Sequence, residues 1–345
     1  MRVAELFEPH RFRLVEKPAS EPGPGEVQVR VEAVGVCGSD LHYFAEGGVG
    51  DTPCVYPMVL GHEPAGVVTR VGPGVSGWAP GDRAALEPAL YCYHCEFCLS
   101  GRHNVCANLR FFSTPQDPGF FRDYVNLPAH NLLPLPADLS CQEATLFEPL
   151  AVVLHSLTLA APRPGERAAV FGAGPIGLMT IAVLKLCGAG RVWAVEPIAH
   201  RRELALRLGA DAAIDPLAVD PVREILGESG GRGVDAAIDC AARGPSINQC
   251  LHVTRSAGRV VVTGIPAEVQ VPLEFHVMRR KELVFYNVRR SNRESETALE
   301  LVRERRRLFA PMLTHEVPLE KVQRGFSILE NYEDGVGKML IRLPT

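Results

Sequence analysis

The chain has 345 residues, of which 46% are hydrophobic and 22% charged, and its formal net charge is −4. This length and balance favour about two globular domains and exclude a strongly basic surface, so we expect no nucleic-acid partner. No apolar run reaches the ~18 residues of a membrane-spanning helix, and the first residues, MRVAELFEPHRF, lack the apolar core of a signal peptide. We therefore expect no membrane association and a cytoplasmic protein.

Residues 1–149 are predicted to form a β-rich domain. Short apolar runs such as VQVRVEAVGV and GVVTRV alternate with turn sequences such as EPGPGE and GPGVSG. Short strands separated by glycine and proline turns give this pattern.

Four cysteines lie close together within this first domain: Cys92, Cys95, Cys98 and Cys106. Ten cysteines in a chain of this length are too few for a disulfide framework, so in a reducing compartment the cluster favours a metal site. Four thiolates complete a tetrahedral zinc site and leave no position for substrate, so we predict a structural role. His94 and His103 are nearby alternative ligands.

A second candidate zinc set has mixed chemistry. Its members are Cys37, His62, Glu63 and Glu148. Sulfur, nitrogen and oxygen ligands together are typical of a catalytic zinc site, which can keep one position open. Either or both glutamates could complete the set.

After residue 149 the pattern alternates between strands and helices, which predicts βαβ units and a parallel, doubly wound sheet over residues 150–286. Six strands are expected, at 168–174, 191–196, 212–215, 234–240, 259–265 and 282–287, with clear helices at 176–189 and 200–210.

A G-x-G-x-x-G sequence lies between the first strand and helix of this domain. Gly172 permits the tight turn, Gly174 lets a pyrophosphate approach the backbone, and Gly177 allows close packing of helix on strand. The second strand ends in Glu196, whose carboxylate can accept hydrogen bonds from the ribose hydroxyls. The same carboxylate would repel a 2′-phosphate, so NAD is favoured over NADP. Arg201 could stack on adenine, although Arg201 or Arg202 could also bind that phosphate. The expected NAD-binding residues are Gly172, Gly174, Pro175, Ile176, Gly177, Glu196, Arg201, Thr263, Gly264 and Ile265.

Residues 287–345 are too few for a separate core. They contain an amphipathic helix over 291–309 and a last strand over 337–343. We expect this tail to return to the first domain, which would make that domain discontinuous (1–149 plus 287–345), with the nucleotide-binding domain inserted in it.

Together these motifs resemble the zinc-containing medium-chain alcohol dehydrogenases. The resemblance covers nearly the whole chain, and CGSDLHY at 37–43, PMVLGHE at 57–63 and FEPL at 147–150 are most similar to the sorbitol (L-iditol, xylitol) dehydrogenase branch. It implies an α/β fold with a Rossmann sheet inserted in a discontinuous, β-rich, GroES-like domain. It also implies two zinc ions per chain, NAD, a homodimer or homotetramer, and oxidation of a secondary hydroxyl of a polyol to a ketose.

The resemblance also implies roles for individual residues. Cys37 and His62 match catalytic zinc ligands, Glu63 matches the further ligand of polyol dehydrogenases, and Glu148 matches a residue near the metal or its water. Ser39 and His42 match a proton relay, and Asp40 matches a carboxylate that orients the zinc-binding histidine.

The substrate end departs from the pattern. Tyr43, Phe112, Thr114 and Glu148 fall where polyol dehydrogenases line their pocket. Sorbitol dehydrogenases carry Phe-Arg-Tyr near the end of the nucleotide domain, whereas here the arginine, Arg289, is displaced by about three residues. A secondary alcohol, butanediol or threonine dehydrogenase therefore remains an alternative, as does a non-catalytic binding protein on the same scaffold.

Overall fold

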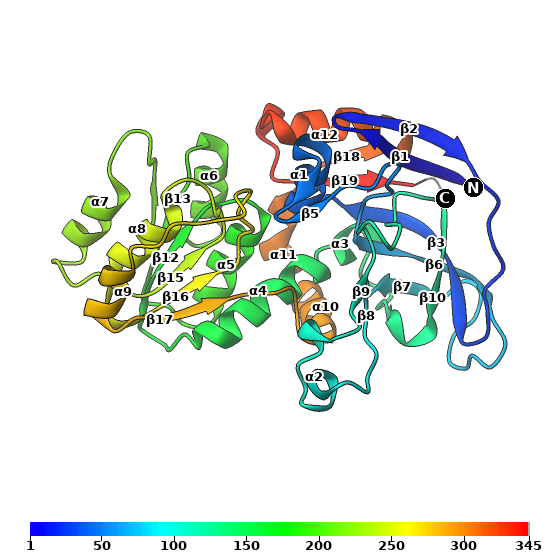
Figure 1. Cartoon of the computed structure of the whole chain (residues 1–345), viewed down its shortest axis with the longest axis horizontal. Helices are drawn as coiled ribbons and strands as arrows, with labels where there is room; N and C mark the ends of the chain where they lie inside the picture. Colours follow the sequence, from blue (N-terminus) through cyan, green and yellow to red (C-terminus); the bar gives the residue numbers. More distant parts are fainter. Residues whose placement is uncertain (344–345) are drawn as a thin grey trace. The chain divides into compact units, whose positions relative to one another are not determined.

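The computed structural model describes residues 1–343, and their contacts divide the chain into two compact units (Figure 1). The first unit contains Met1–Pro149, Ser295–Arg306 and the chain from Leu313 onward, and the second contains Leu150–Glu294 and Arg307–Met312. Each unit is built around its own principal sheet.

The first unit is organised by a seven-stranded, mostly antiparallel sheet. The strand order is β11-β7-β6-β3-β19-β18, and β10 also pairs with β3. The strands are β3 (Glu26–Gly35), β6 (Glu63–Val71), β7 (Arg83–Leu86), β10 (Tyr124–Pro128), β11 (Leu132–Pro134), β18 (Leu313–Pro318) and β19 (Lys338–Arg342).

Three two-stranded ribbons and several helices complete this unit. The ribbons are β1 (Arg2–Glu8) with β2 (Arg11–Glu16), β4 (Gly48–Val49) with β5 (Thr52–Pro53), and β8 (Ala89–Leu90) with β9 (Arg110–Phe111). The helices are α1 (Gly38–Glu46), α2 (Glu96–Leu99), α3 (Cys141–Ala144), α10 (Ser295–Glu304) and α12 (Val322–Glu330); α4 (Phe147–Ala160) and α11 (Arg306–Phe309) continue into the second unit.

Strand β3 forms because its apolar side chains alternate. Val27, Val29 and Val31 are fully buried, while Arg30 and Glu32 between and after them are half-buried. The strand pairs antiparallel with β6 on one side and with the C-terminal strand β19 on the other. This central strand therefore joins sequence from both ends of the chain in one sheet.

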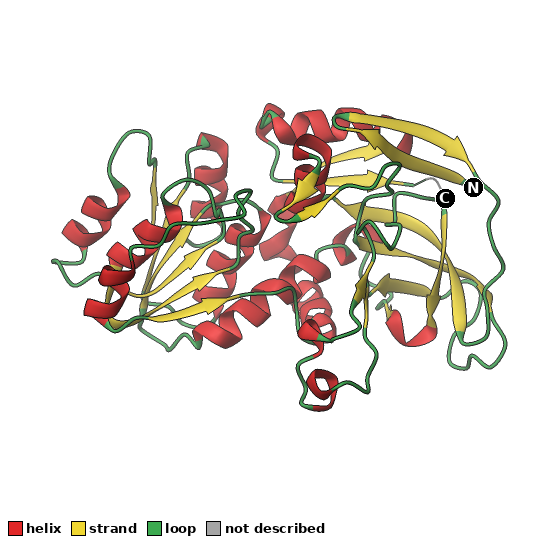
Figure 2. Ribbon diagram, viewed as in Figure 1, coloured by secondary structure: helices red, strands yellow, loops and turns green. Residues whose placement is uncertain are grey.

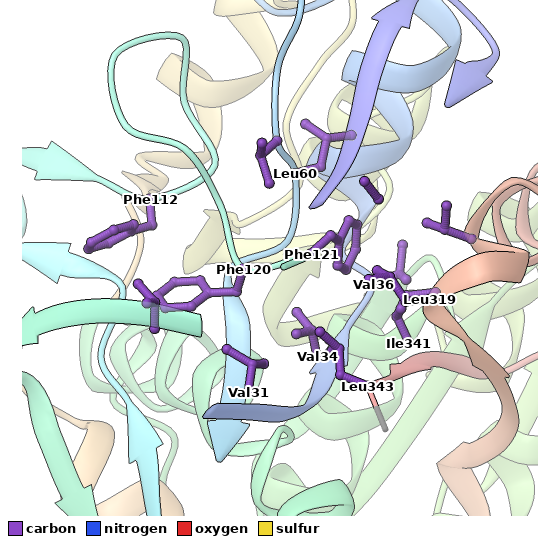
Figure 3. Packing of buried hydrophobic residues seen from close by; sticks show 14 of the residues in the cluster. Val31, Val34, Val36, Leu60, Phe112, Phe120, Phe121, Leu319, Ile341 and Leu343 are labelled. Carbon is purple, nitrogen blue, oxygen red and sulfur yellow. The ribbon is translucent and has the colours of Figure 1, made fainter. Parts of the chain in front are cut away.

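Aromatic and branched side chains fill the core beneath this sheet (Figure 3). The rings of Phe112 and Phe120 lie 4.8 Å apart, and Phe121, Leu60 and Val34 belong to the same buried cluster. Burial of such side chains contributes roughly 1.5–3 kcal/mol each before entropy is counted. The core fixes the ends of β3 and β6, where the mixed ligand set lies.

The second unit contains a six-stranded parallel sheet in the order β14-β13-β12-β15-β16-β17. The strands are β12 (Arg167–Phe171), β13 (Arg191–Val195), β14 (Ala212–Ile214), β15 (Val234–Asp239), β16 (Thr254–Val262) and β17 (Val284–Asn287). The helices are α5 (Pro175–Leu186), α6 (Ala199–Arg207), α7 (Pro221–Glu228), α8 (Ser246–Val253) and α9 (Phe275–Lys281), and they lie on both faces of the sheet (Figure 2). The predicted α/β fold class and its six parallel strands are confirmed.

One stretch of the described chain, Cys141–Ala160, is long and apolar enough to cross a membrane by length and composition alone. Most of it, 72%, is buried inside the protein. Burial of this kind is what the core helix of a globular protein shows, so the stretch gives little support to a membrane span.

Candidate active site, zinc sites and nucleotide site

The four-cysteine loop brings its sulfur atoms together. The Sγ atoms of Cys92 and Cys106 lie 3.4 Å apart, those of Cys95 and Cys106 3.9 Å, and those of Cys92 and Cys98 4.0 Å. Zinc–sulfur bonds of about 2.3 Å in a tetrahedron separate the sulfurs by roughly 3.8 Å. The set therefore fits a closed zinc site.

Local backbone geometry favours the thiolate forms of Cys92 and Cys95, whereas burial raises the pKa of the Cys98 thiol to about 12. Cys95 caps α2, and its sulfur accepts the N–H of Cys98 at 3.5 Å. A backbone hydrogen bond from His94 is the main cause that lowers the pKa of Cys92 to about 5. The His94 ring lies 2.6 Å from the carbonyl oxygen of Cys92, so this alternative ligand is held by the backbone.

The mixed set is assembled by the pairing of β3 with β6. Gly35 lies opposite Glu63 in the register, so the turn after β3, which contains Cys37, meets the segment that leads into β6. Gly61 has φ of +90°, and a Cβ there would lie 2.7 Å from the Phe121 ring, so glycine is required next to His62.

Cys37, His62 and Glu63 each direct one ligand atom to the same place, and these atoms all lie within 4.8 Å of one another. His62 and Glu63 are buried and Cys37 is half-buried. One thiolate, one imidazole and one carboxylate form a donor set that fits zinc and leaves a fourth position open.

Asp40 orients this set through its contacts with His62 and Cys37. Its Oδ1 lies 3.3 Å from Nδ1 of His62, which leaves Nε2 as the ring nitrogen available to a metal. The same carboxylate accepts the N–H of Cys37 at 3.0 Å and the hydroxyl of Ser113 at 2.9 Å. Burial opposes ionisation, but His62 and the backbone N–H groups outweigh it and lower the pKa of Asp40.

A buried lysine that the sequence analysis missed contacts the set. Nζ of Lys338, in β19, donates to Oε1 of Glu63 at 2.6 Å and to the carbonyl oxygen of Val36 at 3.0 Å. Lys338 is 1% exposed, and Glu63 is fully buried. The one available signal was a lysine directly before the apolar residues Met339–Ile341. Nothing local relates this lysine to a residue 275 positions away.

Glu148 lies in the first turn of α4, buried near the mixed set but not among the three residues whose ligand atoms cluster. Burial is the main cause that raises the pKa of Glu148 to about 8; His62 opposes the rise and Glu63 adds to it. Glu87 adds to it as well, and its Oε2 accepts a hydrogen bond from Ser295.

The predicted relay residues both lie on α1. Ser39 is half-buried in the first turn, and Nδ1 of His42 lies 2.8 Å from Oε2 of Glu46, one helical turn further on. Their roles stay predictions.

The predicted substrate residues are divided between the units. Tyr43 and Phe112 are buried in the core of the first unit, and Thr114 lines a cavity of about 150 Å³ together with Val59 and Arg122. Arg289 is exposed in the second unit, just after β17. Their contacts with substrate also stay predictions.

The glycine loop joins β12 to α5 as expected from the sequence. Gly172 has φ of +90°, and a Cβ on Gly177 would overlap the carbonyl oxygen of Gly172. Beside Gly174 the nearest atom to a built Cβ is Nη1 of Arg201, 3.9 Å away. Open space next to backbone N–H groups at the start of a helix fits a pyrophosphate.

Glu196 is held at the end of β13 by two backbone N–H groups. Its Oε2 accepts from Ala173 at 2.7 Å and its Oε1 from Ile198 at 3.0 Å, which fixes the carboxylate beside the glycine loop. A carboxylate has about four acceptor positions, so ribose hydroxyls can still bind.

Arg202 points elsewhere, to the carbonyl oxygens of Glu196 and Pro197 and to Asp215 at 3.0 Å. Of the two arginines considered, Arg201 is therefore the one beside the loop.

The segment Thr263–Ile265 follows β16. Thr263 Oγ1 lies 2.8 Å from the hydroxyl of Ser156 in α4, and Ile265 is 47% exposed. Thr263 is thus held by the protein itself, whereas Ile265 is accessible to a bound molecule.

Comparison with known families agrees with this arrangement. Residues 23–137 match the alcohol dehydrogenase GroES-like domain, and residues 175–304 match the zinc-binding dehydrogenase domain. The first match contains the clustered ligands of both sets, and the second begins at Pro175, within the glycine loop, and covers most of the second unit.

Similar proteins cover between about three quarters and all of the chain. Sorbitol dehydrogenase of Gallus gallus is 36% identical over 97% of this chain and 94% of its own length. D-xylulose reductase A of Aspergillus niger is 37% identical over 76% and 75%, respectively. The solved structure of 2R,3R-butanediol dehydrogenase from Bacillus subtilis matches 100% of this chain and 99% of its own, with a TM-score of 0.89 at 30% identity. Such similarity, together with two zinc-type donor sets and a dinucleotide loop, shows that the chain belongs to the zinc-containing medium-chain dehydrogenases, as an NAD-dependent alcohol or polyol dehydrogenase.

Proposed function

We propose that this enzyme oxidises a secondary hydroxyl of a polyol of the sorbitol, xylitol or L-iditol type to a ketose, with NAD as hydride acceptor. The observation that carries the proposal is the Cys37–His62–Glu63 set. Its third ligand is a carboxylate, and a second thiolate in its place would make the zinc ion softer. A harder zinc ion suits a substrate that offers several hydroxyl oxygens. The similarity to sorbitol dehydrogenases and xylulose reductases supports the same substrate class.

Each residue has a defined part in this proposal. Cys37, His62 and Glu63 would hold a zinc ion, which when bound supplies Lewis-acid chemistry that lowers the pKa of a substrate hydroxyl. NAD supplies the hydride acceptor. Asp40 holds the His62 ring in one orientation.

The remaining polar groups would handle the substrate and its proton. Glu148, buried beside the ligand set, would hydrogen-bond a substrate hydroxyl or a water molecule. Ser39 would accept the hydroxyl proton, and His42, paired with Glu46 near the surface, would pass it to solvent.

A second candidate is a dehydrogenase of simple secondary alcohols, butanediol or threonine. The position of Arg289 favours it, because the arginine that would contact sugar hydroxyls is displaced along the chain. The similarity to a butanediol dehydrogenase supports the same alternative.

A substrate panel separates the two candidates. Initial rates would be measured with NAD and sorbitol, xylitol, L-iditol, galactitol, 2,3-butanediol or threonine. The polyol proposal predicts the highest kcat/KM on one of the four polyols. Turnover confined to 2,3-butanediol or threonine would contradict it and establish the alternative on the same scaffold.

We also propose a cytoplasmic homo-oligomer. β17 is an edge strand of the parallel sheet, and apolar side chains are exposed just before and within it, including Val269, Val271, Phe275 and Val284. Exposed apolar surface beside an open strand edge favours pairing with a second copy of the chain.

A further inference from the structure

Asp239, the last residue of β15, is a fully buried carboxylate to which the proposed mechanism assigns no role. We propose that it is a positioning residue, which fixes the two loops after β15 and β16 that hold the nicotinamide half of NAD, next to the glycine loop. The proposal does not depend on the identity of the alcohol substrate.

The side chain of Asp239 organises the loop that follows it. Oδ1 accepts the N–H groups of Ala241 and Ala242, each at 3.0 Å, and Oδ2 accepts the hydroxyl of Ser246 at 3.2 Å. Three donors on a single buried carboxylate define the path of residues 240–246. Removal of the carboxylate would leave these donors buried without acceptors, which is costly.

The backbone around Asp239 ties that loop to two others. The carbonyl oxygen of Asp239 accepts the N–H groups of Thr263 at 2.8 Å and Gly264 at 2.9 Å, where β16 ends. The N–H of the next residue, Cys240, donates to the carbonyl oxygen of Phe171 at 2.8 Å, directly before the glycine loop. Asp239 and Cys240 together therefore connect the ends of β12, β15 and β16.

The three loops also pack without spare room. A Cβ on Gly172 would lie 2.9 Å from the Cβ of Ala241, and a Cβ on Gly264 would lie 2.8 Å from the Cβ of Ala242. Both distances are too short for carbon atoms. The Asp239 loop therefore lies so close to both turns that only glycine fits at residues 172 and 264.

The sheet order assigns these loops to one half of the dinucleotide. A doubly wound sheet binds a dinucleotide where its strand order reverses, which is between β12 and β15 here. Glu196 at the end of β13 lies on the adenosine side of that point. β15 and β16 lie on the other side, so the loops fixed by Asp239 face the nicotinamide half.

Asp235 provides a matched control on the same strand. It is also buried, near the opposite end of β15, where it accepts the N–H of Arg167 at 2.9 Å and binds Arg232 and Arg255 at 2.7 Å each. Both carboxylates stabilise the second unit. Asp235, however, lies at the amino-terminal ends of the strands, away from the cofactor loops at their carboxyl ends.

The test compares binding of NADH and of ADP, which lacks the nicotinamide half, to the full-length, zinc-replete enzyme. Nicotinamide fluorescence would give the Kd of NADH and calorimetry that of ADP, for wild type, Asp239→Ala, Asp239→Asn and Asp235→Ala. Asp239→Ala is expected to weaken NADH about tenfold or more while ADP changes less than about twofold. Asp239→Asn keeps Oδ1 for both N–H groups, so NADH affinity should stay within about threefold of wild type.

Asp235→Ala should lower the melting temperature and leave both affinities within about twofold of wild type. Two results would overturn the proposal: unchanged NADH affinity in folded Asp239→Ala, or equal weakening of NADH and ADP. If Asp239→Ala does not fold, Ser246→Ala decides, because it removes only one of the three donors. NADH should then bind about threefold more weakly, and unchanged affinity would overturn the proposal.

Discussion

The contact between Glu63 and Lys338 couples the mixed ligand set to the C-terminal strand. Both groups are buried, and Nζ also donates to the carbonyl oxygen of Val36, next to Cys37. A buried charge that loses its partner is strongly destabilising, whereas a bound cation can replace that partner. The lysine is therefore expected to matter most when zinc is absent.

Lys338→Met tests this expectation. After treatment with a chelator, the variant should lose about 3–5 kcal/mol of unfolding free energy relative to wild type, because Glu63 is left as an unpaired buried charge. With zinc bound, the loss of unfolding free energy should be clearly smaller. In the zinc-free protein, adding Glu63→Gln to Lys338→Met should recover much of the lost unfolding free energy. Urea unfolding of the wild type and the two variants, each with and without zinc, gives these values, and an equal loss with and without zinc would argue against the coupling.

The four-cysteine loop should act on stability alone. Phe97 and Leu99 in this loop are exposed, so little burial of apolar side chains stabilises the loop. A bound zinc ion would provide that stabilisation instead. Cys95→Ser should reduce zinc from about two ions per chain to about one and lower the melting temperature, while hydride transfer persists in the folded protein. Metal analysis and steady-state rates measure both effects. Lost turnover in a folded variant that keeps its catalytic zinc would contradict a purely structural site.

Local spacing explains why these sites could be predicted. Cys92, Cys95, Cys98 and Cys106 lie within fifteen residues, and His62 and Glu63 are adjacent, so the pattern itself carries the chemistry. Lys338 and Ser113 could not be found in this way, because each meets its partner only through the sheet and core, 275 and 73 residues away along the chain. The sequence also left both glutamates open as ligands, whereas only Glu63 lies within the 4.8 Å cluster.

Secondary structure in the nucleotide-binding unit follows its hydrophobic periods closely, and all six expected strands occur. The tail is less regular: the helix predicted over 291–309 is divided into α10 and α11, with Arg305 between them. Arg303 and Arg306 both reach Asp138, and Arg306 also binds Glu143. The helical periodicity of a sequence cannot predict long-range ion pairs of this kind.

The junction of β12 and α5 gives a test at two neighbouring glycines. Gly174→Ala should fold like wild type, since only Arg201 Nη1 lies near the added methyl, but NADH should bind about tenfold more weakly where the pyrophosphate approaches. Gly177→Ala should instead lower the melting temperature, because its methyl would overlap the Gly172 carbonyl oxygen. Thermal melts and NADH titration distinguish the two. Equal thermal loss in both variants would contradict this assignment.

The proposed homo-oligomer would use the surface before and along β17. Val271 and Phe275 are exposed apolar residues there, and β17 ends the sheet. Val271→Asp combined with Phe275→Asp should shift the enzyme to monomers, because two desolvated carboxylates would face each other across the interface. Sedimentation velocity measures the shift, and Leu217→Asp, at an exposed residue remote in sequence, is the matched control. An unchanged oligomer would place the interface elsewhere.

Polyol oxidation is expected to depend on the zinc ion held by Cys37, His62 and Glu63. The most direct test of this dependence is the initial rate of NAD reduction with xylitol and sorbitol, measured on the same preparation as purified, after removal of zinc by a chelator, and after zinc is restored. Metal analysis accompanies each stage. We predict turnover with about two zinc ions per chain, loss of turnover when about one or none remains, and recovery on addition of zinc. Polyol oxidation that continues undiminished in the metal-free protein would contradict the account.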